Sequence, residues 1–599
     1  DIYFHGTDGV PAQDGRLHLD LALAVQDFRY SFVQVLVNDV PKWSQSITTP
    51  NVEIPVDLPL SSAELSHAFV KVTIRFGGRL NDDRCYDWRT NGSYIAVKPG
   101  SGVQYSYRSE QLATIDGAWS VLPRAVTVAI PAGPLTPAAY RAAWQTGVAL
   151  LRAGHVVTYA PFSGDLAAVG TFITPPADTS DGTGVVVVAG ESALGAGGDS
   201  SARGANLTLS RVNGRPVLVV GDSFPAAQFL VEDWRHVAQS DRLRIDVSRA
   251  RRDVGAASPT ITFQQLGLGS IPRDLAERAE WSFPFSVRDL SPGFIPADID
   301  LDVVAGLSPD RKGTVAQLFL NDVLVRSASI NESGVAQRIS AELPRRLIGV
   351  DNTLRLVLQR KAANSLSPST GECRALAAAT PAQVLETSVI TGKRIDDLTE
   401  FLELPALFRN GFDVYLPATA LAEPTATLPF LARLGADVLP MADLDTLTFY
   451  DAAHSPAPKR SFLLLGSADG VHVDAPARYE RGRLVVDDLA KLPVLDLTGN
   501  ARSSVVEIGR VGGVSGLVVL PMSAGALATP QAVALSRGDL AFVSATGVDL
   551  VVDSRAGTRG IPRIGAPFGK YRYWAYAIMA LLAAIIIIYT ARRVRSQRS

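Results

Sequence analysis

Hydrophobic and polar residues alternate in short stretches in two separate parts of the chain. The first part holds LHLDLALA (17–24), VQVLVNDV (33–40) and VKVTIRF (70–76), and the second holds DIDLDVVA (298–305), AQLFLNDV (316–323) and TLRLVLQR (353–360). A period of two is typical of strands that bury one face and expose the other. Turn formers bound the stretches, and we therefore predict two antiparallel, jelly-roll-like β-sandwiches.

These two sets of strands match each other in order. The Asn-Asp pair at 38–39 returns 283 residues later, at 321–322. Further along, VDLPL (56–60) is matched by AELPR (341–345). Several matches in the same order at a nearly constant offset indicate a duplicated module.

Each predicted sandwich is followed by a different pattern, in which strands alternate with an amphipathic helix. In TPAAYRAAWQTGVALLRAG (136–154), Tyr140, Trp144, Val148 and Leu151 recur at helical spacing. Apolar runs typical of strands covered by helices on both faces flank this helix: AVTVAIPA (125–132), HVVTYAP (155–161), GVVVVAG (184–190) and RPVLVVGD (215–222). The second half repeats the theme with FDVYLPA (412–418), ATLPFLARLGAD (426–437), RSFLLLGSAD (460–469) and GVSGLVVLP (513–521). The pattern predicts two doubly wound, flavodoxin-like α/β domains.

Near the C-terminus, YWAYAIMALLAAIIIIYTA (573–591) is a run of 19 residues without a charge. As a helix it spans roughly 28 Å, about the thickness of a bilayer core. Interfacial aromatic and basic residues frame an apolar centre, and we name as anchor residues Tyr573, Trp574, Ile585, Ile588, Tyr589, Arg592 and Arg593. We predict one transmembrane helix rather than a buried core helix, with the Arg-rich tail 592–599 in the cytoplasm and the bulk of the chain outside.

The segment before this helix has two open interpretations. Residues 557–572 mix basic residues with Ile561, Ile564 and Phe568, which suits a segment in the lipid headgroup layer. Its Gly and Pro content equally suits a plain linker.

The expected organisation therefore has seven parts. They are a sandwich (1–115), an α/β domain (116–275), a second sandwich (276–395), a second α/β domain (396–556), the interfacial segment (557–572), the transmembrane helix (573–591) and the tail (592–599).

Length and charge agree with this organisation and narrow the partners. At 599 residues the chain is too long for one hydrophobic core. It carries 57 Lys and Arg against 59 Asp and Glu, a formal net charge of −2, which excludes nucleic acid as the main partner. The sequence opens on Asp1 without a signal-peptide pattern, so no targeting signal is readable from it.

Motifs for cofactors and metals are missing from the sequence. No GxGxxG follows a first strand, no GxxxxGK[ST] occurs, and the seven histidines lack metal-ligand spacing. We therefore expect no cofactor, no metal site and no catalytic residues.

One alternative is a Gly-Asp-Ser hydrolase, membrane-tethered and periplasmic. VVGDSF (219–224) places Ser223 after an apolar run, and Asp233 and His236 follow. A helix starting at Ser223 would separate Ser223 from His236 by about 20 Å, and an N-cap role explains Ser223 without catalysis.

The segment RCYDWRTNGSY (84–94) concentrates aromatic and polar residues beyond a strand end. Its candidate carbohydrate-binding residues are Trp88, Tyr86 and Tyr94, which can stack on pyranose rings, and Arg84, Asp87 and Asn91, which can bond hydroxyl groups. A small local core with an Arg84–Asp87 ion pair explains the same residues, and both interpretations stay open. The matching ECRALAAATPAQ (372–383) has no Trp or Tyr. If either sandwich binds carbohydrate, we expect it to be the first.

Cys85 and Cys373 are the only cysteines and occupy matching positions in the two sandwiches. In an oxidising compartment two such cysteines suggest one disulfide. The chain-entropy model assigns roughly 5 kcal/mol to a loop of this length, as an upper bound.

Four alternating domains with a C-terminal helix, together with LVNDV (36–40), LNDDRCYDW (80–88) and LFLNDV (318–323), resemble the membrane-anchored B subunit of bacterial cellulose synthase. The resemblance covers essentially the whole chain. It implies a non-catalytic periplasmic partner of a membrane-embedded family 2 glycosyltransferase, which is activated by cyclic di-GMP and extrudes β-1,4-glucan made from UDP-glucose. The implied partners are that catalytic subunit, nascent cellulose, inner-membrane lipid and further copies of the chain. The family's flavodoxin-like domains carry no flavin, and its anchor helix supports activity.

Overall fold

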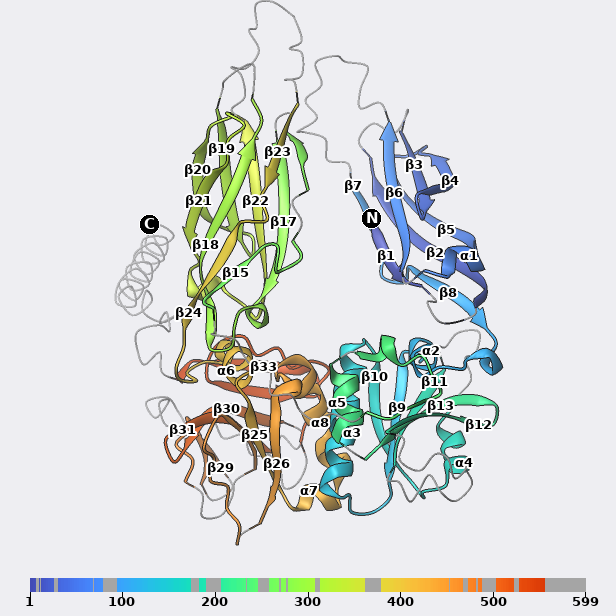
Figure 1. Cartoon of the computed structure of the whole chain (residues 1–599), viewed down its shortest axis with the longest axis vertical. Helices are drawn as coiled ribbons and strands as arrows, with labels where there is room; N and C mark the ends of the chain where they lie inside the picture. Colours follow the sequence, from blue (N-terminus) through green and yellow to red (C-terminus); the bar gives the residue numbers. More distant parts are fainter. Residues whose placement is uncertain are drawn as a thin grey trace, which may run out of the picture.

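The computed structural model describes residues 1–6, 10, 12–25, 31–67, 69–78, 94–173, 182–189, 206–222, 224–232, 234–245, 258–268, 271–275, 278–307, 313–360, 379–451, 453–466, 472–480, 483–486, 503–521 and 527–554. In Figure 1 two all-β domains stand side by side above a layer of two α/β domains. Both cysteines and the predicted segments 557–572, 573–591 and 592–599 lie outside the described residues. No helix within the described ranges is long and apolar enough to cross a membrane.

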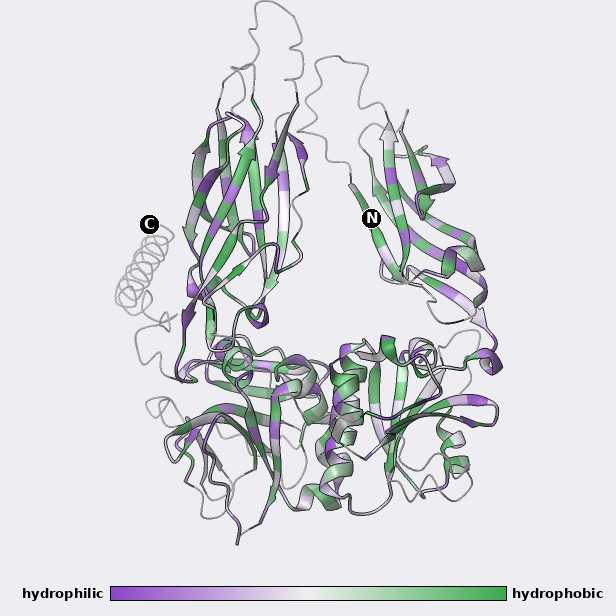
Figure 2. Cartoon of the chain, in the orientation of Figure 1, coloured by the Kyte–Doolittle hydropathy of each residue, from purple (hydrophilic) through white to green (hydrophobic). Residues whose placement is uncertain are grey.

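The first sandwich packs two antiparallel sheets face to face. One sheet has the order β1-β6-β3-β4; the other has the order β5-β2-β7, with β8 also paired to β2. The elements are β1 (Ile2–His5), β2 (Ala12–Ala24), β3 (Ser31–Val37), β4 (Val40–Ser46), β5 (Asn51–Ser61), α1 (Ser62–Leu65), β6 (Phe69–Gly78), β7 (Tyr94–Val97) and β8 (Gly102–Tyr107). Alternation has the predicted effect, because Leu17, Leu19 and Leu21 of β2 are buried while the residues between them are half-buried. Figure 2 shows the two classes of residue alternating along these strands.

The second sandwich repeats this pairing, which confirms the duplication. Its elements are β15 (Thr260–Thr262), β16 (Arg273–Leu275), β17 (Arg278–Ser286), η7 (Val287–Asp289), β18 (Phe294–Ala305), β19 (Thr314–Leu320), β20 (Val323–Ile330), β21 (Gln337–Glu342), η8 (Arg345–Leu347), β22 (Asp351–Arg360), β23 (Thr380–Val384) and β24 (Val389–Arg394). β17-β22-β19-β20 reproduces β1-β6-β3-β4, and β18 pairs with β21, β23 and β24 as β2 pairs with β5, β7 and β8.

One domain boundary and one match between the repeats differ from the sequence prediction. Strands β15 and β16 pair with β24 and β23, so residues from 258 onward belong to the second sandwich and not to the preceding α/β domain. These short strands give almost no periodic signal. In addition, Val56 lies opposite Leu19 while Ile339 lies opposite Leu301. VDLPL therefore matches residues 339–343 and not 341–345, because a shift of two residues keeps the same face buried and the pattern cannot detect it.

The repeated Asn-Asp pair forms the hairpin turn of each sandwich. Both residues of each pair have positive φ, 47° and 66° at Asn38 and Asp39 and 48° and 65° at Asn321 and Asp322. A two-residue hairpin turn with both residues in this region is the type I′ turn, for which Asn and Asp are well suited. Both turns also bind to the neighbouring strand of their own sheet.

The first α/β domain contains a mixed sheet with the order β10-β9-β11-β13-β12-β14. The elements are η2 (Ser109–Gln111), α2 (Ile115–Ser120), β9 (Ala125–Pro131), α3 (Pro137–Arg152), β10 (Val156–Phe162), α4 (Leu166–Val169), η3 (Gly170–Phe172), β11 (Thr183–Ala189), β12 (Leu207–Val212), β13 (Arg215–Gly221), α5 (Phe224–Val231), η6 (Trp234–Val237) and β14 (Arg242–Leu243). Strands β10, β9, β11 and β13 run parallel, as expected from their apolar runs. β12 and β14 are antiparallel additions that the sequence did not predict.

The second α/β domain repeats this arrangement with the order β26-β25-β27-β31-β30-β32-β33. The elements are η9 (Phe401–Glu403), α6 (Leu404–Phe408), β25 (Phe412–Pro417), α7 (Thr419–Ala422), α8 (Pro424–Asp437), η10 (Met441–Asp443), β26 (Leu444–Tyr450), β27 (Phe462–Leu465), β28 (Ala477–Glu480), β29 (Arg483–Val486), β30 (Ser504–Val511), β31 (Val514–Pro521), β32 (Leu540–Ser544) and β33 (Gly547–Val552). In both domains an antiparallel hairpin follows the third parallel strand. The flavodoxin-like assignment is therefore not confirmed, because that fold continues with parallel strands.

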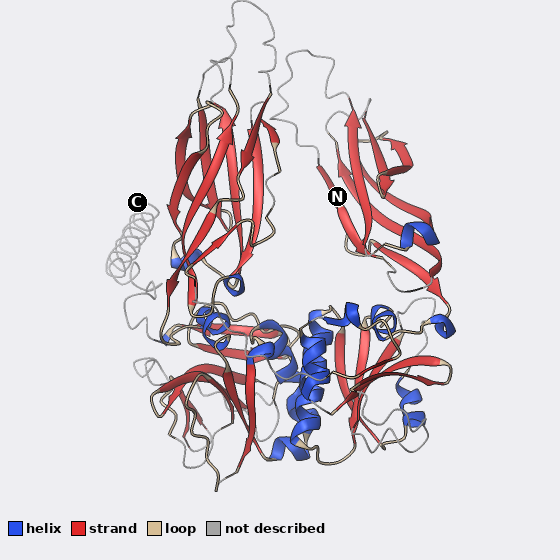
Figure 3. Ribbon diagram, in the orientation of Figure 1, coloured by secondary structure: helices blue, strands red, loops and turns tan. Residues whose placement is uncertain are grey.

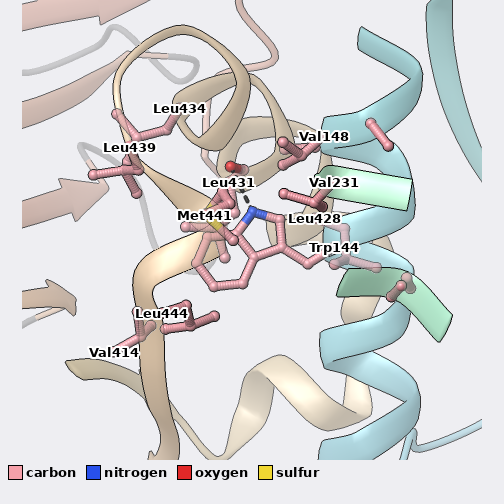
Figure 4. Close-up of a cluster of buried hydrophobic side chains, with 14 of the residues drawn as sticks. Trp144, Val148, Val231, Val414, Leu428, Leu431, Leu434, Leu439, Met441 and Leu444 are labelled. Atoms are coloured by element: carbon pink, nitrogen blue, oxygen red, sulfur yellow. Dashed lines mark hydrogen bonds between the residues drawn. The ribbon is translucent and has the colours of Figure 1, made fainter. Parts of the chain in front are cut away.

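Helices α3 and α8 join the two α/β domains along their length, and Figure 3 shows the helices gathered at this junction. The hydroxyl groups of Tyr140 and Thr427 lie 2.5 Å apart, and the indole nitrogen of Trp144 donates to the carbonyl of Leu431 at 2.7 Å. Both contacts join residues 287 positions apart, so the helices run parallel with equivalent residues facing each other. Trp144 is fully buried among residues of both domains (Figure 4), and a single hydrophobic core runs through the pair.

Candidate functional site

Tyr94 is the one predicted carbohydrate-binding residue that the structure describes. Arg84, Tyr86, Asp87, Trp88 and Asn91 lie outside the described residues, as do both cysteines. Tyr94 opens β7 with a relative exposure of 59%. It pairs with Ala24 of β2, whose side chain points away from the core, so Tyr94 stands on the outer face of the β5-β2-β7 sheet.

Strand register places small residues beside Tyr94 on this face. Ala24 lies between Tyr94 and Asn51, and the next outward position, Ala22, lies between Ala96 and Glu53. Alanine side chains leave the sheet surface low around the tyrosine ring. A ring-shaped ligand can therefore reach the face of Tyr94 without meeting bulky neighbours on β2.

Charged residues continue the same face along β2. Lys98 binds Glu53 at 2.5 Å across the sheet. Nδ1 of His18 lies 3.0 Å from Oδ1 of Asp57, and Nε2 of His18 lies 3.4 Å from Asp20. The hydrogen bond with Asp57 raises the pKa of His18 above its usual value, and Asp20 acts in the same direction. We call the outward residues 18, 20, 22, 24, 51, 53, 57, 94, 96 and 98 the outer face of the first sandwich.

On the same face of the second sandwich, the polar side chains bind to one another. Arg338 binds both carboxylate oxygens of Asp302, at 2.9 and 3.1 Å, and the hydroxyl of Thr387 donates to Asp302 at 2.8 Å. These contacts hold the pKa of Asp302 below its usual value, with Arg338 as the largest cause. The position of Tyr94 is taken by Pro381, as the pairing of β23 with β18 shows. The exposed tyrosine is therefore specific to the first sandwich.

The second sandwich does contain aromatic residues, but the structure places them in its core. Trp281, Phe283 and Phe285 of β17 and Phe263 are all buried in its core. The three residues of β17 point inward because they occupy alternate positions of a strand with one buried face.

The residues of the alternative hydrolase are described only in part. Ser223 and Asp233 lie outside the described residues. The helix expected from Ser223 is α5, which ends at Val231, and His236 follows on η6. Nδ1 of His236 lies 3.6 Å from a carboxylate oxygen of Asp116, a residue that the sequence did not single out. The hydrolase stays a prediction without a described nucleophile.

Within the described ranges, no group of three or more His, Cys, Asp or Glu side chains is placed to hold a metal ion. A cavity of about 360 Å³ lies where the two α/β domains meet, at the ends of β9 and β10 and the start of α8. Its lining is Ile130, Pro131, Gly133, Pro161, Ala422, Glu423, Pro424, Thr425 and Ala426. This lining is mostly apolar and offers little chemistry.

The sequence pattern did not predict most residues of the outer face of the first sandwich, although it contains part of the information. Alternation in LHLDLALA puts His18, Asp20, Ala22 and Ala24 on one side of a strand. Their neighbours on β5 and β7 follow only from the strand register, which the pattern does not fix.

Comparisons with known proteins give no family. No family model and no curated protein matches the sequence. Among solved structures, a family 35 carbohydrate binding module from an environmental isolate is 15% identical, with 21% of this chain and 80% of that chain covered and a TM-score of 0.13. A family two carbohydrate esterase from Clostridium thermocellum in complex with cellohexaose is 11% identical, with 24% and 31% covered and a TM-score of 0.11. A putative beta-galactosidase from Bacteroides fragilis is 13% identical, with 26% and 20% covered and a TM-score of 0.12. Likeness at this level does not decide the function of the chain.

Proposed function

We propose that the chain is a non-catalytic, carbohydrate-binding scaffold, the periplasmic accessory subunit of a cyclic di-GMP-activated cellulose synthase. In this proposal the helix 573–591 anchors it in the inner membrane beside the catalytic glycosyltransferase, and the described domains receive the nascent β-1,4-glucan. The observation that carries the binding role is the outer face of the first sandwich, with Tyr94 exposed above alanines. The assignment to a cellulose synthase complex rests on the sequence resemblance.

The chemistry of this face suits a neutral sugar polymer. A tyrosine ring can pack against the apolar face of a pyranose, while amide, carboxylate, imidazole and ammonium groups can bond its hydroxyls. Outward residues from His18 to Ala24 extend along one strand for about 20 Å. That length allows several sugar rings to lie along β2, with Tyr94 at one end.

The α/β pair suits a scaffolding role. The apolar faces of helices α3 and α8 are buried against each other. These faces are therefore not available to bind a ligand or a partner. Such a shared core fixes the two domains in one relative position. We propose that the pair is the base that carries both sandwiches above the membrane.

Binding can be tested with the detergent-purified full chain and cellohexaose by isothermal titration calorimetry. Replacing Tyr94 with Ala should weaken association about tenfold, a loss of about 1.4 kcal/mol, while Tyr94→Phe should keep most of it. Pro381→Ala, at the matching position of the second sandwich, is the control and should change nothing. Unchanged binding in folded Tyr94→Ala protein would remove this face from the glucan path.

The synthase assignment needs a separate test. A glycosyltransferase should copurify with the chain, and synthesis should fail when the chain is truncated before Tyr573. Glucan synthesis that persists without the helix would reject the accessory role, whatever the outcome for Tyr94.

A further inference from the structure

The two sandwiches are attached to the α/β pair in different ways. In the second half, the segment formed by η9 and α6 contributes to two cores at once. Phe401, Leu404 and Phe408 belong to the α/β core, and Leu402 and Ala406 belong to the core of the second sandwich. A helix shared between two cores ties the second sandwich rigidly to the α/β pair.

Polar contacts reinforce that attachment. Arg345 of the sandwich binds Glu400 and the buried Glu403 of the shared segment. In the other direction, the guanidinium of Arg409 donates to the carbonyls of Arg288 and Leu290. These contacts surround the shared helix, so rotating the sandwich would break them together.

The equivalent helix of the first half, α2, lacks the apolar residues that would face a sandwich. The backbone N–H of Ile115 donates to Ser240 as that of Phe401 donates to Gly538, and both acceptors lie two residues before an equivalent strand. This alignment puts Asp116 and Ser120 where Leu402 and Ala406 stand. Ile115 and Ala118 join the α/β core, as Phe401 and Leu404 do.

The core of the first sandwich accordingly ends within the sandwich. Its described members run from Phe4 to Tyr105, and no described residue of α2 is among them. After β8 the chain enters the α/β domain through residues 108–113, a connection that contains only the short η2. Figure 1 shows β8 leading down into this connection.

One side chain organises the connection. Arg211 of β12 donates to the carbonyl of Ser109 at 2.8 Å and, through its other terminal nitrogen, to Glu110 at 3.2 Å and Leu112 at 2.8 Å. The hydroxyl of Ser109 donates to the carbonyl of Gly214 at 3.3 Å, in the turn that follows β12. One guanidinium therefore binds three backbone carbonyls of the connection and holds it against β12.

We propose that the first sandwich is a hinged arm on a rigid body made of the other three domains. Residues 108–113 are the hinge, and Arg211 is its latch, meaning the side chain whose hydrogen bonds restrain the hinge. Hinges are short connecting segments between bodies that keep their own cores. The arm would carry the outer face with Tyr94, so the latch sets the position of that face. This inference goes beyond sugar binding and does not depend on it.

The hinge can be tested by measuring distances between spin labels in the full chain. The labels are noncanonical amino acids, so the native cysteines remain. One pair joins Ser44 of the first sandwich to Ala153, and the matched control joins Ser327, the equivalent residue of the second sandwich, to the same Ala153; all three are exposed. The first pair should give a distribution at least about twice as broad as the control pair.

Variants of Arg211 then test the latch. Arg211→Ala should broaden the first distribution further and leave the control unchanged, and Arg211→Lys should fall between, because ammonium cannot form the forked contact. Equal widths in the unmodified chain would overturn the hinge. If Arg211→Ala fails to fold, the comparison of the two pairs in the unmodified chain still decides the proposal.

Discussion

The asparagine of each Asn-Asp pair explains why this pair recurs in both sandwiches. Asn38 exchanges two hydrogen bonds with Lys71, since its N–H donates to the carbonyl at 2.8 Å and its Oδ1 accepts from the N–H at 3.0 Å. Asn321 does the same with Thr353, at 2.9 and 2.8 Å. The pair therefore forms the turn of one hairpin and fixes that hairpin to the next strand.

This double role predicts a local loss of stability on Asn38→Ala. The variant loses the side-chain bonds to Lys71 and Glu64, and alanine tolerates positive φ poorly, so the first sandwich should lose about 2–3 kcal/mol. Hydrogen exchange of the amides of β3 and β6 measures it. Asn321→Ala is the matched control and should affect β19 and β22 instead. Equal effects on both sandwiches from either variant would contradict the argument.

His18 predicts how the first sandwich responds to pH. Its pKa is raised in the folded state by Asp57 and Asp20. The contribution of His18 to the free energy of unfolding is therefore complete below the unfolded pKa of about 6.5, and it is lost as the pH rises through the folded pKa. The first sandwich should therefore become less stable from about pH 6 upward through that folded pKa. Urea unfolding followed by exchange at β2 checks the trend. His18→Gln should flatten it, and a slope that persists in this variant would assign it to another group.

Among the elements, periodicity predicted the strands well and the connections poorly. Runs such as GVVVVAG became β11, and the helix expected at 136–154 is α3, Pro137–Arg152. β30 was missed because a buried Glu507 interrupts its apolar run. The shared helix formed by η9 and α6 was also missed, since apolar residues on two sides give no single amphipathic face. Of the site, the pattern gave Tyr94 and one strand of the outer face, while the partners of that strand depend on tertiary register.

At the junction of α3 and α8, Trp144 should matter most. It is fully buried, and its indole N–H is satisfied by Leu431. Trp144→Ala removes this bond and leaves a cavity, with an expected cost of about 3–5 kcal/mol. The variant should expose amides in both α/β domains to exchange, because they share the core. Protection lost from only the first domain would mean that the two cores are separate.

Arg152 supports the same junction from the helix end. Its guanidinium donates to the carbonyls of Gly435 and Leu439 at 3.0 and 2.8 Å, where α8 ends. Burial lowers the pKa of Arg152, yet a guanidinium stays charged at neutral pH. A positive charge at a helix C-terminus is favourable, so this contact couples the helix dipole of one domain to the other domain.

For the whole molecule, the contacts define two units rather than four domains. One hydrophobic core runs through both α/β domains, and the second sandwich shares a helix with them. The first sandwich has its own core and joins the rest through residues 108–113. The duplicated sequence therefore gives an asymmetric body, with one module fixed and its copy attached by a short connection.

This division predicts two cooperative transitions on unfolding. The first sandwich should open as one unit. The two α/β domains and the second sandwich should open together as another, because cooperativity follows continuous cores. Hydrogen exchange against increasing urea, read at β2, β11 and β18, separates the units. In Asn38→Ala protein only the β2 transition should shift to lower urea, and in Trp144→Ala protein β11 and β18 should shift together. A single transition at all three strands would show that the first sandwich is as firmly joined as the second.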